Sequence, residues 1–144
     1  MNSPELTFAD QFAAGWAAPT TERLLALLTE DVVLYQPHLP PLRGKAAARA
    51  EFDRLFHWLP GLHGTVHRAR GADGVVYIEW TMQFPIGRGV AIDAVDRFYL
   101  RDGLGAERTV YFDQLPLIAG VLRSPSAWAG YLRYRLGSDS SSSA

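Results

Sequence analysis

The chain has 144 residues, of which 48% are hydrophobic and 20% charged, a length and composition typical of one globular domain with a single core. Its 14 basic and 15 acidic residues give a net charge of −1, which argues against a nucleic-acid partner because polyanion binding needs a concentrated positive surface. There is no cysteine and no apolar run near the ~20 residues that span a bilayer, so we expect a cytoplasmic protein without a membrane segment.

The N-terminal part of the sequence predicts two helices and a short strand. Aromatic residues recur every four positions between Thr7 and about Ala18, which indicates a first helix capped by Thr7 or Ser3. The leucines of residues 24–28 recur at helical spacing and predict a second helix. Bulky and β-branched residues 32–35 then predict a strand, and the prolines that follow it predict a loop.

The rest of the chain predicts a third helix followed by a run of strands. The helix begins after Gly44 and ends at Pro60-Gly61. The polarity then alternates with a period of two residues, and the predicted strands are His63–Arg70, Val75–Phe84, Val90–Arg101 and Glu107–Leu115. A final amphipathic segment covers 128–136, and the serine-rich residues 137–144 predict a disordered tail. Helices followed by antiparallel strands indicate an α+β fold, with the helices on one face of a curved sheet.

Two segments carry a family resemblance. Residues 24–56, LLALLTEDVVLYQPHLPPLRGKAAARAEFDRLF, resemble the start of the SnoaL-like, NTF2-like superfamily and are most similar to its limonene-epoxide hydrolase branch. Residues 95–113, VDRFYLRDGLGAERTVYFD, are similar to the closing hairpin of that family. The resemblance implies a single SnoaL-like domain over residues 1–136, with a cone-shaped fold, a small-molecule pocket inside the cone, and a homodimer formed through the sheet.

Asp96 is the first candidate catalytic residue. The even positions of Val90–Leu100 are otherwise apolar, which predicts that Asp96 points into the core. Burial raises the pKa of such a carboxyl group and favours its neutral form, which can donate a hydrogen bond to an oxyanion. Resemblance to ketosteroid isomerase, a member of the superfamily, places Asp96 at that enzyme's oxyanion-hole acid. The alternative is a structural contact with an arginine or a tyrosine hydroxyl.

The other catalytic positions of the family are only partly retained. The isomerase's base corresponds to Gln36, whose amide orients a carbonyl or a water but does not abstract a proton. The Arg-x-Asp pair of the epoxide hydrolases corresponds to Tyr77 and Glu79, and their last aspartate corresponds to Val110. Alternation leaves the orientation of Glu79 open; inside the pocket it would be a second carboxylate beside Asp96.

The predicted pocket is hydrophobic with few polar groups. We expect His38 to lie on a loop at the mouth of the cone. It is either an acid or base of the pocket or a solvated loop residue. The candidate substrate-binding residues are Trp16, Tyr35, His38, Phe56, Tyr77, Phe98, Val110 and Phe112. They favour a small hydrophobic ligand with one or two polar groups. The histidines lack the spacing of a metal motif, so we expect neither a metal nor a cofactor.

Three functions are consistent with these features. The first is an enzyme that isomerises, cyclises or opens the epoxide of a lipophilic molecule, with Asp96 as acid or oxyanion donor and with Gln36 and Glu79 orienting water or a carbonyl. The second is a non-catalytic binding protein for such a molecule. The third is a dimeric interaction module whose cone is filled.

Overall fold

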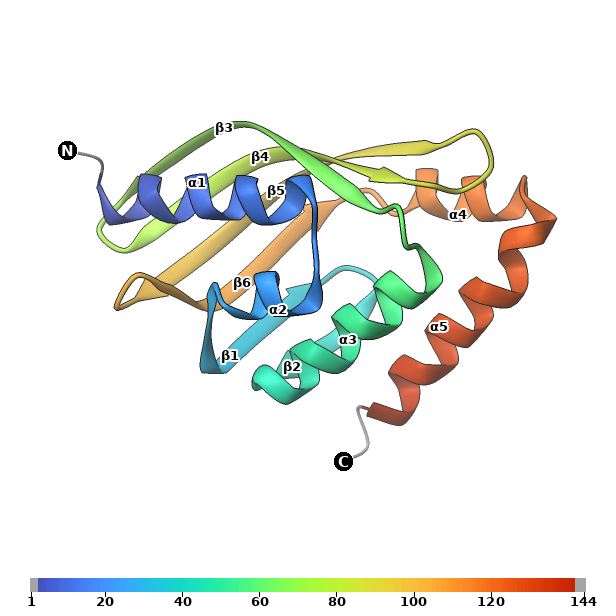
Figure 1. Cartoon of the computed structure of the whole chain (residues 1–144), viewed down its shortest axis with the longest axis horizontal. Helices are drawn as coiled ribbons and strands as arrows, with labels where there is room; N and C mark the ends of the chain where they lie inside the picture. Colours follow the sequence, from blue (N-terminus) through green and yellow to red (C-terminus); the bar gives the residue numbers. More distant parts are fainter. Residues whose placement is uncertain (1–2, 142–144) are drawn as a thin grey trace.

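The computed structural model describes residues 3–141 and shows a curved sheet with helices packed against one of its faces (Figure 1). In chain order the elements are α1 (Pro4–Ala17), α2 (Thr21–Leu25), β1 (Leu28–Gln36), β2 (Leu39–Arg43), α3 (Lys45–Trp58), β3 (His63–Ala72), β4 (Val75–Phe84), β5 (Val90–Arg101), β6 (Leu104–Phe112), α4 (Leu115–Leu122), a 3-10 turn (Pro125–Ala127) and α5 (Trp128–Ser141). The six strands are ordered β2-β1-β6-β5-β4-β3. Among the neighbouring strands within residues 3–141, β1 and β6 are parallel and the other pairs are antiparallel. The predicted α+β architecture is therefore confirmed.

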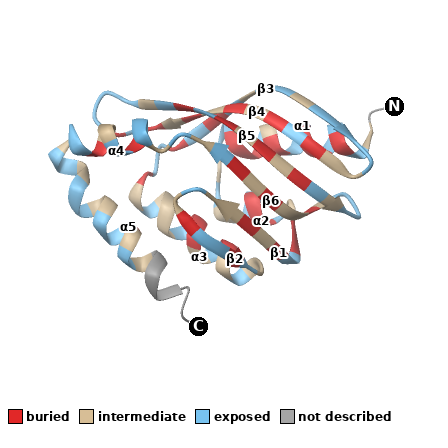
Figure 2. Ribbon diagram, turned by 180° about the vertical axis from the view of Figure 1, so that it is seen from behind, coloured by how far each residue is buried: buried red, intermediate tan, exposed pale blue. Residues whose placement is uncertain are grey.

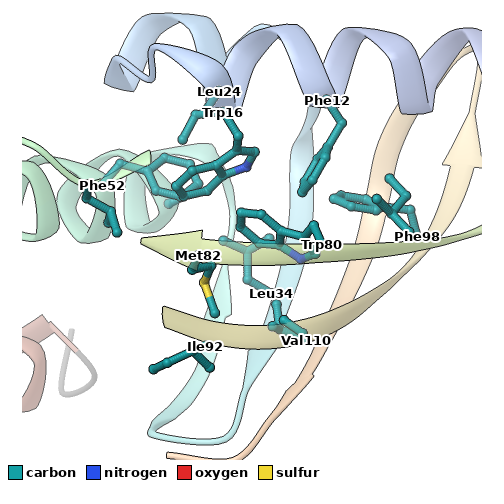
Figure 3. Packing of buried hydrophobic residues seen from close by; sticks show 14 of the residues in the cluster. Phe12, Trp16, Leu24, Leu34, Phe52, Trp80, Met82, Ile92, Phe98 and Val110 are labelled. Atoms are coloured by element: carbon teal, nitrogen blue, oxygen red, sulfur yellow. The ribbon is translucent and has the colours of Figure 1, made fainter. Parts of the chain in front are cut away.

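Helix α1 covers the sheet with an aromatic stripe. The Ser3 hydroxyl accepts a hydrogen bond from the Leu6 amide at 3.3 Å, so Ser3 caps the helix and Thr7 lies within it. Buried Phe12 and Trp16 meet Trp80 of β4, with ring centroids 5.0 and 4.8 Å apart. Figure 3 shows these rings converging between the helix and the sheet. Helix α1 therefore contributes its aromatic side chains to the core of the cone.

Long-range pairing moves the boundaries predicted for residues 24–43. The second helix ends at Leu25, and β1 already begins at Leu28, where the amide of Gly105 on β6 donates to the Leu27 carbonyl at 2.8 Å. The expected proline loop contains β2, which includes Pro40 and lies at the edge of the sheet. An edge strand tolerates proline because one side of it needs no ladder hydrogen bond.

The C-terminal segment contains one more helix than the sequence predicted. Helix α4 follows Asp113, whose Oδ1 accepts a hydrogen bond from the Leu115 amide at 2.9 Å. Helix α5 continues to Ser141, past the predicted boundary at Leu136. The last part of the predicted tail, 142–144, lies outside the described residues.

The two faces of the sheet differ in burial. In β4 and β5 the even-numbered residues are mostly buried and the odd-numbered residues are partly or fully exposed, which gives the alternating bands of Figure 2. The buried face is concave and carries the helices. The other, convex face is open to solvent.

Candidate active site

A small cavity lies between the concave face of the sheet, α3 and the C-terminal helices. Its volume is about 40 Å³, which suffices for a few water molecules. The walls are mainly apolar and aromatic. They are interrupted by five residues with polar or charged ends: Gln36, His38, Glu51, Arg108 and Tyr134.

Arg108 forms the polar part of the cavity floor. It lies on β6 and is 5% exposed. Its Nε donates a hydrogen bond to Oδ2 of Asp96 at 2.6 Å, and Nε1 of Trp80 donates to Oδ1 of Asp96 at 2.8 Å. The guanidinium carbon also lies 5.7–6.0 Å from the centroids of four aromatic rings, which adds cation–π attraction. The cation is thus held in one position.

This geometry revises the role predicted for Asp96. The residue is fully buried, as expected, and burial raises the pKa of its carboxyl group while Arg108 and Trp80 oppose that shift. However, both carboxylate oxygens accept hydrogen bonds from the protein, and Asp96 does not line the cavity. The arrangement is the arginine contact that the sequence left as the alternative. Arg108, not Asp96, lines the cavity.

A second polar cluster lies where α3, α5 and the β1–β2 turn border the cavity, the end that we call its mouth. Glu51 of α3 is 1% exposed; it accepts a hydrogen bond from the Tyr134 hydroxyl of α5 and one from Nη2 of Arg54 at 2.9 Å. Nε2 of His38 lies 2.9 Å from the same hydroxyl. Helices α3 and α5 and the β1–β2 turn therefore meet at one phenol group.

The proton positions in this cluster follow from its donors. Tyr134 has one hydroxyl proton and donates it to Glu51, so Nε2 of His38 carries the proton shared with the tyrosine oxygen. Nδ1 is then unprotonated, and it has no hydrogen-bond partner among residues 3–141. Burial, with the charges of Arg135 and Arg108, lowers the pKa of His38 to about 4, so the ring is neutral near pH 7.

Glu51 combines a carboxylate with an apolar environment. Burial raises the pKa of Glu51, and the Tyr134 hydroxyl, Arg54 and Arg108 oppose that increase. The pKa of Tyr134 is also raised well above its ordinary value, by burial and by Glu51. A raised pKa makes a carboxylate a stronger base, which is the property that a proton acceptor in an active site needs.

The cavity brings together about half of the predicted site residues. Trp16, Gln36, His38, Val110 and Phe112 line it, as predicted. Phe56 packs behind Trp16, with ring centroids 6.2 Å apart, and Phe98 lies in the core below Arg108. Neither of these two lines the cavity.

Three predicted site residues are not in the cavity. Glu79 and Tyr77 occupy odd positions of β4 and point to the convex face, where Glu79 pairs with Arg68. The even-numbered side chains of β4 are more apolar and face the helices, so the odd-numbered side chains face the solvent. Tyr35 points away from the cavity because successive strand residues face opposite sides of the sheet and its neighbour Leu34 is buried. The orientation of Glu79 that alternation left open is thus toward the convex face, and Glu79 adds no second carboxylate to this cavity.

Three polar residues of the cavity were missed in the sequence. Arg108 shares an even-numbered face of β6 with Val110, so the alternation that identified Asp96 also identifies it. Glu51 interrupts the apolar stripe of α3 between Ala48 and Phe52, which is a usable signal. The position of Tyr134 depends on the turn between α4 and α5, and nothing in the sequence indicated it.

Residues 3–141 contain neither a cluster of metal-binding side chains nor a membrane-spanning helix. No group of three or more His, Cys, Asp or Glu side chains within residues 3–141 is arranged to hold a metal ion. None of the helices in that range has both the length and the apolar character needed to cross a membrane.

Comparison with solved structures places the fold. An LEH-like epoxide hydrolase from M. tuberculosis is 21% identical over 88% of this chain and 95% of that one, with a TM-score of 0.70. A protein proposed to be a SnoaL-like polyketide cyclase, from Jannaschia sp. CCS1, is 19% identical over 84% and 95%, with a TM-score of 0.71. TerC, co-crystallised with polyporic acid, is 19% identical over 83% and 98%, with a TM-score of 0.73. These similarities confirm the cone-shaped NTF2-like fold.

Sequence comparison identifies the family. A search of curated proteins finds none that matches the chain. The model of the SnoaL-like domain matches residues 9–108, which is more than half of the chain and includes β1 to β5 and Arg108. The chain therefore belongs to the SnoaL-like family.

Proposed function

We propose that this chain is an enzyme that acts on a small lipophilic molecule inside the cone, by isomerisation, cyclisation or epoxide opening. The observation that carries the proposal is the buried Arg108 guanidinium at the floor of an apolar cavity whose mouth holds a carboxylate and a neutral imidazole. Each of these reactions develops negative charge on an oxygen atom. A fixed buried cation stabilises such charge more strongly than water does.

Arg108 is the group that binds the oxyanion. Its charge is permanent, since guanidinium groups stay protonated in proteins. Asp96 and Trp80 hold it in place before the substrate arrives, so little reorganisation is needed during the reaction. Asp96 is accordingly a positioning residue and not the acid itself.

Glu51 and His38 are the groups that exchange protons with the substrate. Glu51 lines the cavity, and burial raises the pKa of its carboxyl group, which favours its accepting a proton from a substrate. The free Nδ1 of His38 is an additional acceptor, and the amide of Gln36 orients a carbonyl or a water in the same cavity. The similarity to an epoxide hydrolase and to polyketide cyclases supports these reaction classes.

A non-catalytic binding protein is the second candidate. It is favoured by Gln36, an amide at the position where the family's isomerases carry a base. The same cavity would then bind the ligand through Arg108 and release it unchanged.

The test begins with native mass spectrometry of the purified protein and identification of any co-purifying ligand, followed by incubation with terpenoid epoxides, steroid enones and linear polyketides. We expect turnover in at least one class. Glu51→Gln should lower turnover by about 100-fold, the lower end of the range for general acid–base catalysis. The matched control is Glu79→Gln on the convex face, which should retain full activity. Binding without turnover would favour the carrier, and wild-type activity in Glu51→Gln would remove Glu51 from the mechanism.

A further inference from the structure

The Tyr134 side chain is held at the cavity mouth in the manner of a bound ligand. It is 3% exposed although it belongs to the last helix. Its ring is nearly parallel to that of Trp58 on α3, with centroids 5.1 Å apart and an angle of 22°. Its hydroxyl contacts Glu51 and His38. One tyrosine thus fills an aromatic slot that ends in two polar groups.

The two polar groups select a hydroxyl. Glu51 accepts a hydrogen bond from the oxygen at this position, while Nε2 of His38 donates one to it. A hydroxyl satisfies both partners, whereas a ketone or an ether only accepts. Nη2 of Arg54 donates to Oε2 of Glu51, so an occupant that does not donate leaves the buried Oε1 without the hydrogen bond that Tyr134 supplies, which carries a desolvation cost. The subsite is therefore specific for a group that both donates and accepts.

Helix α5 lies at the end of the described chain and is attached to α3 and to the β1–β2 turn. It is the last described element, and its outward residues Leu132 and Leu136 are exposed. Its inner face lies close to α3: a Cβ added to Gly130 would be 2.7 Å from the Trp58 ring. Its attachment to the sheet is through the β1–β2 turn, where Nη1 of Arg135 donates a hydrogen bond to the His38 carbonyl; displacement of Tyr134 therefore requires this hydrogen bond to open or to adjust.

We propose that Glu51 and His38 form a hydroxyl-binding subsite that Tyr134 occupies as an internal ligand, and that a ligand carrying a phenol or enol hydroxyl enters by displacing Tyr134. This inference rests on the proposed function, since it assigns a substrate class to the same cavity. It also accounts for the cavity volume of about 40 Å³: withdrawal of the phenol ring adds the space that an aromatic ligand needs, with Arg108 at the inner end.

The experiment replaces the missing side chain by a free molecule. Tyr134→Ala removes the phenol, and 4-methylphenol is the chemical equivalent of what was removed. We expect calorimetry to show that Tyr134→Ala binds 4-methylphenol at least tenfold more tightly than toluene, which lacks the hydroxyl, and than 4-methylanisole, which only accepts. Equal affinities for the three compounds, or no binding, would overturn the hydroxyl subsite.

Tyr131→Ala is the matched control. Tyr131 lies on the same helix and also packs on Trp58, with ring centroids 5.5 Å apart, but it is not part of the Glu51–His38 cluster. Its removal should create no preference for the phenol. A preference of equal size in Tyr131→Ala would show that the compounds bind at the outer face of Trp58, which contradicts the proposal.

A second variant covers the case in which Tyr134→Ala does not fold. Tyr134→Phe keeps the ring and removes only the competing hydroxyl, so it should bind 2-naphthol more tightly than the wild type does. In the wild type, 2-naphthol should increase amide hydrogen exchange across residues 128–137, whereas naphthalene should not. Unchanged affinity in Tyr134→Phe together with unchanged exchange would refute displacement. These readouts need no turnover, so they can fail while the enzyme proposal stands, and the reverse also holds.

Discussion

At the scale of single residues, Asp96 and Arg108 form a buried ion pair, and removal of either charge alone should lower the stability of the fold. The Asp96→Asn variant keeps the size of the side chain and the hydrogen bond from Trp80 but leaves the Arg108 charge buried without a counterion. We expect the free energy of unfolding to fall by about 3–5 kcal/mol, measured by urea unfolding at pH 7.

Two further variants make this prediction specific. Glu79→Gln breaks an exposed ion pair with Arg68 and should cost less than about 1 kcal/mol. The double variant Asp96→Asn/Arg108→Met removes both charges and should recover part of the lost stability. If Asp96→Asn costs no more than Glu79→Gln, Asp96 does not hold Arg108.

His38 predicts a pH dependence of stability. Its pKa is lowered to about 4 in the folded chain, whereas a histidine in an unfolded chain titrates near 6.5, so between these values the unfolded chain binds a proton that the folded chain does not. The free energy of unfolding therefore falls by roughly 3 kcal/mol as the pH drops from about 6.5 to about 4, and this contribution is fully present above 6.5. Glu51 acts in the opposite direction, because its pKa is raised by folding.

The contribution of His38 is isolated by comparison with His38→Gln, whose amide can still donate to the Tyr134 hydroxyl. Denaturant unfolding at pH 4.5 and pH 7.5 should show a larger acid-induced loss in the wild type than in this variant. The exposed His57 supplies the control, since His57→Gln should follow the wild type at both pH values. Equal losses in the wild type and His38→Gln would show that His38 titrates as in the unfolded chain.

At the scale of elements, the sequence predicted what depends on local pattern. The bounds of β4 and β5 agree with the prediction to the residue, because alternation runs without interruption between glycine- and proline-containing turns. The start of β1 was not predictable in this way. It is set by pairing with β6, whose partner residues lie 74 to 77 positions further along the chain, and no local signal outweighs the helical spacing of the leucines.

The candidate site follows the same division. Val110 and His38 belong to predicted strands or turns, and both line the cavity. Tyr134 lies there because α4 turns the chain back over the mouth, and α4 was not predicted. The orientation of Glu79 depends on which alternating set of β4 side chains faces the helices. The sequence did not decide this, because apolar residues were expected on both faces of the strand. The local sequence pattern thus predicted the strands that form the cone, whereas the position of Tyr134 depends on tertiary packing.

At the scale of the whole molecule, the convex face of the sheet is the surface that we propose for a homodimer. It carries the exposed rings of Tyr77, Tyr99 and Tyr111. Arg97 lies among them, with its guanidinium carbon 5.1 Å from the centroid of Tyr99 and 5.9 Å from that of Tyr111. Tyrosine and arginine are the residue types that most often dominate interface energies.

Sedimentation velocity should therefore show a dimer that Tyr111→Glu weakens at least tenfold, since a charge placed at the centre of an aromatic interface is costly to desolvate. Leu132→Glu is the informative comparison because it places the same charge on the second exposed apolar surface, formed by α4 and α5. Dissociation by Leu132→Glu alone would mean that the chains associate through α5. In that case Tyr134 could not leave the cavity without breaking the dimer, and access to Glu51 would depend on the oligomeric state.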